Sequence, residues 1–189
     1  MTFQTSEALQ HRNLQPSARA ASDLIHFFHD GDVTVDAPYQ RGAVWTVEQR
    51  ILLIKSLLLG IPVPAIIINR REDAPVGEPF YAVIDGKQRI LALSAWFKSE
   101  LAVPASWFPA EYVESSTDVG DGPYVFRAGL SAVADRMFRN RAILPVAETS
   151  VDTVQEEAAI YLLVNGAGTA QTADDMANAA RVADINTKG

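Results

Sequence analysis

Apolar and polar positions alternate along the chain in helical and extended patterns. Apolar residues at helical spacing predict helices at 22–30, 46–59, 90–97, 130–138 and 152–165. Runs of β-branched and aromatic residues predict strands at 33–35, 63–68, 80–84 and 142–146. Because several connections are too short for a helical crossover, we expect an α+β fold, with a small mixed β-sheet flanked by helices.

Several predicted helices carry end signals in the sequence. Thr46 and Gln49 have the spacing of a capping box, and Gly60 marks the end of the same helix. Ser22 and Asp152 are expected to cap two other helices. The end signals therefore define the helix after Thr46 most completely.

Patterning is weakest at the N-terminus and beyond Leu101. Residues 1–15 are polar and predict a flexible arm, which leaves 16–189 as a single domain. The segment 115–123 is rich in serine, glycine and aspartate and predicts an extended loop with a short hairpin. A last helix is expected from Thr172 to about Asp184.

Composition and charge limit the functions to consider. The 189 residues carry a net charge of −7, so the surface as a whole does not suit a phosphate polymer, and any contact with DNA must be local or made through a partner. Cysteine is absent, which excludes disulfides, thiolate zinc sites and cysteine nucleophiles. The longest apolar run, 51–61, is too short to span a bilayer, and we expect a cytoplasmic protein without membrane contact.

The segment 84–89 joins a predicted strand to a predicted helix through a polar turn. It places a carboxylate at the strand end (Asp85), a glycine that lets a ligand approach the backbone (Gly86), and two cations in the first helical turn. One interpretation is a helix start with surface ion pairs. The other is a phosphate site, in which Asp85 pairs with the cations, binds a phosphate-bound metal or accepts a proton.

A second polar loop, 38–45, lies between another predicted strand and helix. Tyr39 and Trp45 are able to pack on a base or wall a pocket, and Gln40 and Arg41 lie between them. Two interpretations stay open. The aromatic side chains either line a site or are buried and hold the loop, with Arg41 in an internal salt bridge.

Three ordered motifs carry a resemblance to a known family. They are Tyr39-Gln-Arg-Gly-Ala-Val-Trp45, Leu57-Leu-Leu-Gly-Ile-Pro-Val-Pro64 and the segment from Tyr81 to Leu93. Together they resemble the N-terminal domain of GmrSD-type, modification-dependent restriction enzymes, in the ParB/sulfiredoxin-like superfamily. The family signature Asp-Gly-Gln-Gln-Arg stands here at 85–89 with Lys87 in place of the first glutamine, and 164–169 is similar to the family's Asn-Ser-Gly-Gly-Thr loop.

The resemblance implies a site for an NTP with Mg²⁺. It implies catalytic roles for Asp85, Arg89 and Arg41, with Asp85 also holding Mg²⁺ through the nucleotide, and pocket walls at Tyr39 and Trp45. The implied nucleotide and phosphate ligands are Gln40, Arg41, Gly86, Lys87, Gln88, Arg89, Asn165, Gly168 and Thr169.

The implied function is nucleotide binding and NTP hydrolysis in phage or bacterial DNA modification, restriction or counter-defence. Two alternatives stay open: a phosphoryl-transfer kinase acting on a nucleic-acid base or a small molecule, and a non-enzymatic module that binds DNA or a protein partner. The sequence does not define the oligomeric state. GmrSD-type enzymes carry a further nuclease domain of the HNH type, whereas the histidines here are His11, His26 and His29, all upstream of the motifs. We therefore expect this chain not to cleave DNA alone.

One basic cluster lies apart from these motifs. Arg136, Arg139 and Arg141 form the most basic local patch of the sequence. It is either a contact for DNA or a solvated helix face beside an acidic body.

Overall fold

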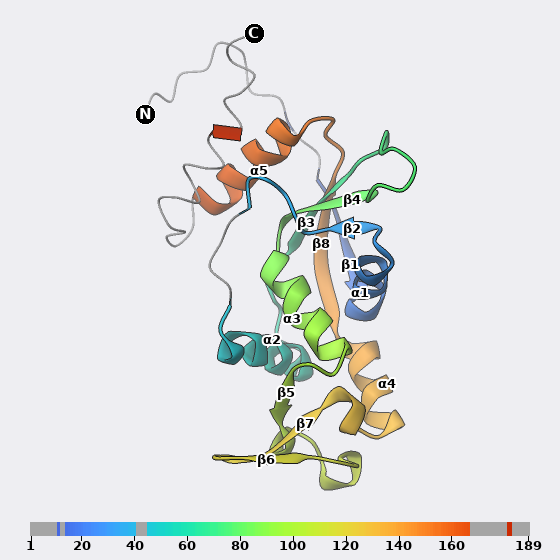
Figure 1. The fold of residues 1–189 in the computed structure, drawn as a ribbon, viewed down its shortest axis with the longest axis vertical. Coiled ribbons are helices and arrows are strands. Elements are labelled where there is room, and N and C mark those ends of the chain that lie inside the picture. Colours follow the sequence, from blue (N-terminus) through green and yellow to red (C-terminus); the bar gives the residue numbers. More distant parts are fainter. Residues whose placement is uncertain (1–10, 12–13, 41–44, 167–180, 183–189) are drawn as a thin grey trace.

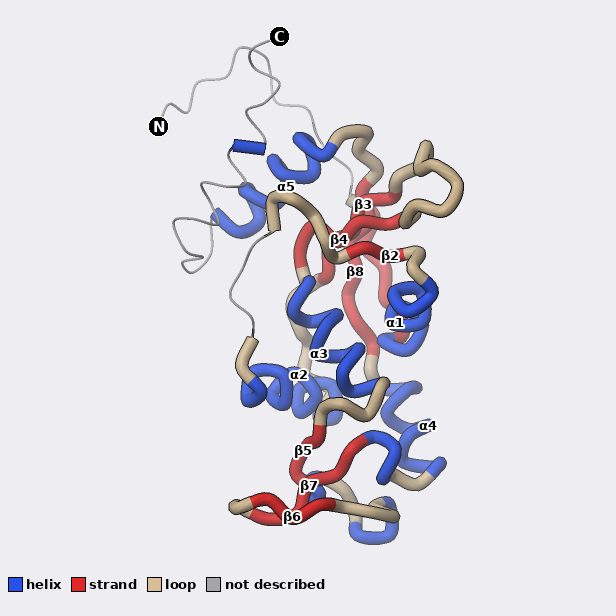
Figure 2. The backbone as a smooth tube through the Cα atoms, viewed as in Figure 1, coloured by secondary structure: helices blue, strands red, loops and turns tan. Residues whose placement is uncertain are grey.

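The computed structural model describes residues 11, 14–40, 45–166 and 181–182. Two β-sheets lie toward opposite ends of an elongated molecule, with helices α2, α3 and α4 between them (Figures 1 and 2). The α-helices are α1 (Ala21–Asp30), α2 (Val47–Leu59), α3 (Lys87–Phe97), α4 (Ala132–Arg141) and α5 (Val154–Gly166). None of the described helices is both long and apolar enough to cross a membrane.

The larger sheet has five strands in the order β1-β8-β3-β4-β2. These strands are β1 (Gln15–Ala20), β2 (Val33–Thr34), β3 (Ile66–Arg70), β4 (Tyr81–Asp85) and β8 (Ile143–Thr149). The pairs β1·β8 and β3·β4 are antiparallel, whereas β3·β8 and β2·β4 are parallel. The prediction of an α+β fold with a mixed sheet is therefore confirmed.

Neighbouring residues of the central strands enter different cores. Ile68 and Val83 belong to the main core, formed with α1, α2 and α3, whereas Ile67 and Ile84 belong to a second core under α5. Side chains alternate across a strand, so a sheet covered on both faces needs apolar residues at consecutive positions. This explains the continuous β-branched run in β3.

The smaller sheet has the order β5-β7-β6 and is antiparallel. It contains β5 (Ala102–Pro104), β6 (Thr117–Val119) and β7 (Gly122–Phe126). The short hairpin predicted near 115–123 is present as β6 and β7. Strand β5 was not predicted, and the 3-10 turns η1 (Ala105–Trp107), η2 (Ala110–Tyr112) and η3 (Arg127–Gly129) complete this region.

Helix ends follow the sequence signals in part. The capping box of Thr46 and Gln49 is present, and Gly60 ends α2 at φ 69°. The prediction for Ser22 is wrong, because α1 begins one residue earlier, without a side-chain cap. The Asp152 prediction is also wrong: the hydroxyl of Thr153, one position later, accepts a hydrogen bond from the amide of Glu156.

Strand β1 was not predicted either. Its residues are mostly polar and exposed because it is an edge strand, whose outer side has no partner strand among the described residues. Its register is set by β8, far along the chain. The side chain of Arg19 also forms an ion pair with Glu148 of that strand. The arm predicted at 1–15 and the helix predicted from Thr172 lie largely outside the described residues.

Candidate functional site

Gly86 makes a sharp turn between β4 and α3. Its φ of 104° lies in the left-handed region, where other residues are strained. A Cβ added there would also lie 2.9 Å from Cγ1 of Ile66. Glycine is therefore required on both counts, and the turn places Asp85 next to the first turn of α3.

The N-terminus of α3 has no side-chain cap, and its first turn holds no acidic residue. By contrast, Thr46 caps α2 and Ser131 caps α4. The first amides of a helix lack acceptors within the helix, and the helix dipole makes this end electropositive. With Lys87 and Arg89 in the same turn, the start of α3 suits an anion.

Arg89 connects the turn to its surroundings. Its Nη2 donates to Oδ2 of Asp85 at 2.5 Å and to the carbonyl of Ala65 at 3.1 Å, and its side chain is 13% exposed. Its Nε is buried and has no hydrogen-bond partner among the described residues. Lys87 forms a more exposed ion pair, with Nζ 3.3 Å from Asp36. Arg89 thus retains an unused donor beside the turn.

The second polar loop meets this turn at both of its described ends. The side chain of Gln40 is buried, and its Nε2 donates to the carbonyls of Val83, at 2.7 Å, and Ile84. At the other end, the backbone amide of Trp45 donates to Oε1 of Gln88 at 3.1 Å. The structure therefore brings together two motifs that are separate in the sequence.

Two buried polar atoms in these motifs have no partner among the described residues. They are Oε1 of Gln40, an acceptor, and Nε of Arg89, a donor. A buried polar atom without a hydrogen bond typically costs about 1–3 kcal/mol. Gln40 contacts the end of β4 and Arg89 follows the turn after it, so a ligand that has both donors and acceptors and reaches both atoms would supply the missing partners.

A groove of about 300 Å³ adjoins Arg89. It lies between α2 and the segment before β3, and its lining is mainly apolar. The lining residues are Trp45, Gln49, Leu52, Leu53, Ser56, Val63, Pro64 and Arg89. Trp45 and Arg89 therefore share one groove, as a pocket-wall role for Trp45 requires.

Tyr39 lies elsewhere, in the second core. It is fully buried, its ring centroid is 5.6 Å from that of Tyr161, and its hydroxyl donates to Oε2 of Glu157 at 3.0 Å. Burial, together with the neighbouring Glu157 carboxylate, raises the pKa of the Tyr39 phenol well above its ordinary value. The structure thus places Tyr39 behind the loop and not among the residues lining the groove.

Glu157 is the centre of a polar cluster that was not predicted. Its side chain is 1% exposed and accepts hydrogen bonds from Tyr39, from Nδ2 of Asn69 at 2.8 Å, and from Nε and Nη2 of Arg71, both at 2.9 Å. The sequence carried one signal for this cluster, because Glu157 lies four positions before Tyr161 and therefore on the same inward-facing side of α5. Its partners are remote in sequence, so the pattern alone did not identify them.

The remaining predicted ligands are only partly placed. Asn165 lies near the end of α5, where its Nδ2 donates to the carbonyl of Tyr161 at 3.0 Å. Arg41, Gly168 and Thr169 lie outside the described residues, so their roles stay predictions.

The structure defines an α+β domain with a mixed five-stranded sheet and a glycine turn between β4 and α3. A family model described as "GmrSD restriction endonuclease, N-terminal domain" matches residues 22–143, which is well over half of the chain. The chain therefore belongs to this family, whose domains occur in modification-dependent restriction enzymes, and the resemblance drawn from its motifs is confirmed. No curated protein and no solved structure matches the chain.

Proposed function

We propose that the turn at 85–89 binds the phosphates of a nucleoside triphosphate, and that the domain hydrolyses this nucleotide in a DNA restriction or modification system. The observation that carries the proposal is the uncapped start of α3 beside two unpaired buried polar atoms, on Gln40 and Arg89. Phosphate oxygens are the acceptors that free helix amides and a guanidinium favour.

Each side chain has a chemical role in this proposal. The amides at the start of α3 and the planar fork of Arg89 would bind phosphate oxygens, and Lys87 would add a point charge after release from Asp36. Oε1 of Gln40 is free to accept from a hydroxyl or a water. The groove beside Trp45 would take an apolar part of the ligand.

Asp85 fits a magnesium ion that arrives with the nucleotide. Mg²⁺ typically takes one or two carboxylates and completes its coordination with phosphates and water. The described residues contain no group of three or more histidine and carboxylate side chains suited to a metal ion, so Asp85 would be one ligand among non-protein oxygens. Bound there, the ion would neutralise charge on the phosphates.

A second candidate is a binding module without turnover, and the ion pairs favour it. Arg89 is engaged by Asp85, and Lys87 by Asp36, so neither cation is free and Asp85 is already neutralised. Nucleotide binding is therefore better supported than hydrolysis.

The test is a thermal-shift and phosphate-release screen of the purified chain with ATP, GTP, CTP and UTP in the presence of Mg²⁺. Stabilisation by one nucleotide, with phosphate release, supports the enzyme, whereas stabilisation without release supports the module. Formation of the nucleoside diphosphate without free phosphate, only when DNA or a nucleoside is added, would indicate the kinase. Arg89→Ala should abolish the shift and Arg70→Ala, an exposed control on β3, should keep it; equal shifts would reject the site.

A further inference from the structure

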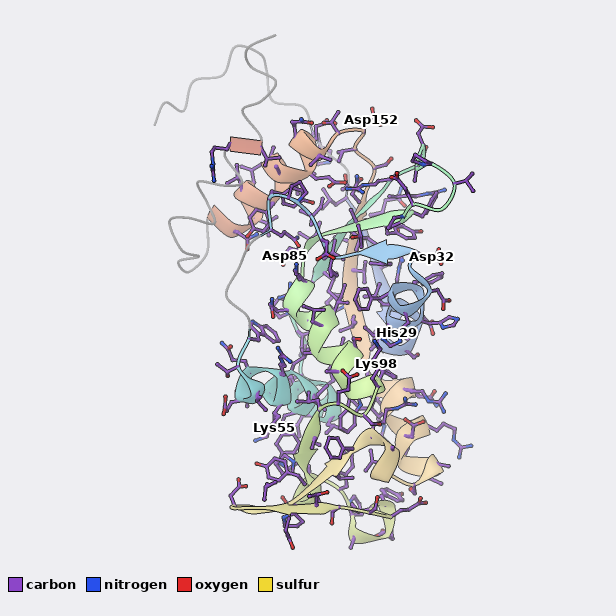
Figure 3. The ribbon with its side chains drawn as sticks, viewed as in Figure 1. His29, Asp32, Lys55, Asp85, Lys98 and Asp152 are labelled. Carbon is purple, nitrogen blue, oxygen red and sulfur yellow. The ribbon has the colours of Figure 1, made fainter. Side chains whose placement is uncertain are left out.

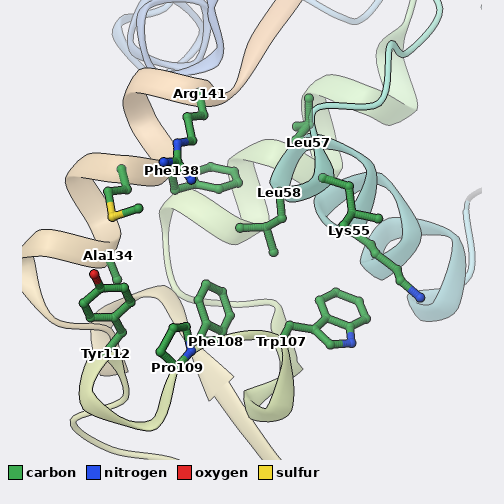
Figure 4. A pocket seen from close by; sticks show the side chains of 12 residues that line it. Lys55, Leu57, Leu58, Trp107, Phe108, Pro109, Tyr112, Ala134, Phe138 and Arg141 are labelled. Carbon is green, nitrogen blue, oxygen red and sulfur yellow. The ribbon is translucent and has the colours of Figure 1, made fainter.

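A second cavity lies at the other end of α2. It measures about 340 Å³, within the range of roughly 300–1,000 Å³ that is usual for organic ligands. Its walls come from the end of α2, from η1 and η2, and from α4 (Figure 4). It shares no lining residue with the groove beside Arg89.

Aromatic rings dominate this cavity. Trp107, Phe108, Tyr112 and Phe138 contribute to its walls, together with Leu58 and Met137. In Figure 4 the side chain of Leu58 points toward the middle, with the rings of Phe108 and Phe138 on either side of it. Aromatic walls favour a flat ring as ligand, because stacked rings gain more than area burial alone.

Two cations lie at opposite sides of the cavity. Figure 4 shows Arg141 above Phe138 on one side and Lys55 beside Trp107 on the other, where Nζ lies 5.4 Å from the ring centroid. No carboxylate of the described residues is within ion-pair distance of either. Most other basic side chains of the described residues do have a carboxylate partner: Arg19, Arg70, Arg71, Lys87, Arg89, Arg127 and Arg139.

We propose that this cavity binds an unstacked nucleobase, with its flanking phosphates on Lys55 and Arg141. A flat ring between aromatic side chains, with a cation on either side, matches a base in a strand, which carries phosphate both before and after it. A fatty acid or another aliphatic anion would need only one cation and would gain less from aromatic walls. The base therefore belongs to a strand, and competition by a free nucleotide tests this assignment.

The cavity explains how an acidic protein would contact nucleic acid. The net charge of −7 disfavours broad phosphate neutralisation, whereas two unpaired cations at one cavity provide a local contact. Figure 3 shows Lys55 away from Asp85, toward the smaller sheet. This site is therefore independent of the proposed phosphate turn, and each can fail without the other.

The experiment measures binding of fluorescein-labelled single-stranded oligo-dT by fluorescence anisotropy across a salt series. Lys55→Gln and Arg141→Gln should each weaken binding and lower the slope of log K against log salt by about 0.7, the value of one phosphate contact. Trp107→Ala should weaken binding by about tenfold through lost stacking. Arg136→Gln removes a charge from the same helix without lining the cavity, and it should bind like the wild type.

Two further arms complete the test. Competition by unlabelled oligo-dT but not by dTMP supports a strand bound through both flanking phosphates, whereas equally strong competition by dTMP would overturn this proposal. Arg89→Ala should keep oligo-dT affinity, which separates this result from failure at the phosphate turn. Absence of binding, or Lys55→Gln and Arg141→Gln variants that match Arg136→Gln in affinity and slope, would overturn the proposal. Circular dichroism of each variant confirms that the fold is retained.

Discussion

Tyr39 and Gln40 are neighbours in the chain, yet their side chains enter two polar clusters that differ in how completely their hydrogen bonds are satisfied. Tyr39 enters the cluster around Glu157, and Gln40 enters the one at the 85–89 turn. One backbone step in the turn closed by the hydrogen bond from the amide of Gln40 to the carbonyl of Ala37, at 3.0 Å, thus joins the two regions.

The Glu157 cluster is closed. Both carboxylate oxygens of Glu157 accept hydrogen bonds, and Asn69 uses its Nδ2 and also accepts the amide of Val151 at 2.8 Å. The turn cluster is open: Oε1 of Gln40 and Nε of Arg89 have no partner among the described residues, and no side chain caps α3. Completed networks hold a structure, whereas incomplete ones at a helix start are available to a ligand. The comparison therefore predicts stability effects from the first cluster and binding effects from the second.

The largest effect is expected from breaking the closed cluster. Glu157→Ala leaves Arg71, Asn69 and Tyr39 without their shared acceptor, and removing one partner of a buried ion pair typically costs about 3–5 kcal/mol. Urea denaturation measures this loss. The control is Glu72→Ala, which removes an exposed carboxylate paired with Arg70 and should cost less than about 1 kcal/mol. Equal losses would show that Glu157 contributes no more than a surface charge.

The next effect tests the turn itself. Gly86→Ala places a Cβ against Ile66 at a positive φ, and strain of this kind costs about 1–3 kcal/mol. The matched control is Gly31→Ala, which has a φ of 88° with no atom within 4 Å of the added Cβ. The two variants share the backbone strain, so the extra destabilisation of Gly86→Ala, measured by thermal denaturation, reports the contact with Ile66. If Gly31→Ala is as destabilising, the close approach has no energetic role.

Much of this architecture follows from local sequence, and the exceptions share a physical reason. The α2 caps, the double-sided apolar run of β3 and the glycine turn depend on neighbours within a few residues. Strand β1 and the partners of Glu157 depend on residues far along the chain; Arg19 and Glu148, for example, are 129 positions apart. The aromatic cavity is likewise assembled from α2, η1, η2 and α4. A sequence pattern therefore predicts the local element but not the residues far along the chain that contact it.

In the candidate site, too, some features follow from local sequence and others depend on residues far along the chain. The 85–89 turn and the loop beginning at Tyr39 were both recognised from local chemistry. The local chemistry left two interpretations open, aromatic side chains that line a site or aromatic side chains that are buried. The structure divides the pair, because Tyr39 is buried against α5 whereas Trp45 lines the groove. The two unpaired atoms of the turn also became visible only once burial was known.

A smaller effect distinguishes the two neighbours directly. Gln40→Leu keeps the size of the side chain but removes the donors to the carbonyls of Val83 and Ile84, at a cost of about 1–2 kcal/mol. It should also weaken the nucleotide affinity measured by calorimetry, because it removes the unpaired oxygen and loosens the loop from β4. Tyr39→Phe is the control, since it changes the closed cluster and should leave that affinity unchanged. If Gln40→Leu and Tyr39→Phe bind the nucleotide with equal affinity, the open and closed clusters do not differ in their role in binding.

The smallest effect is a pH dependence of the closed cluster. The pKa of Tyr39 is raised above its ordinary value of 10.0 by burial and by the Glu157 carboxylate, so the folded state holds the phenol proton more tightly than the unfolded state does. This contribution to stability is fully present below about pH 10, the unfolded pKa of tyrosine, and is lost as pH rises toward the folded pKa.

At neutral pH, Tyr39→Phe should cost about 1 kcal/mol for the lost hydrogen bond. Between about pH 9 and pH 11 the difference between wild type and variant should shrink, because only the wild type loses this term. Urea denaturation at a series of pH values measures the difference, and other alkaline groups cancel from it. Tyr81→Phe, which changes a tyrosine outside the cluster, serves as the control; a Tyr39→Phe difference that stays constant with pH would show that the phenol proton is not held by this cluster.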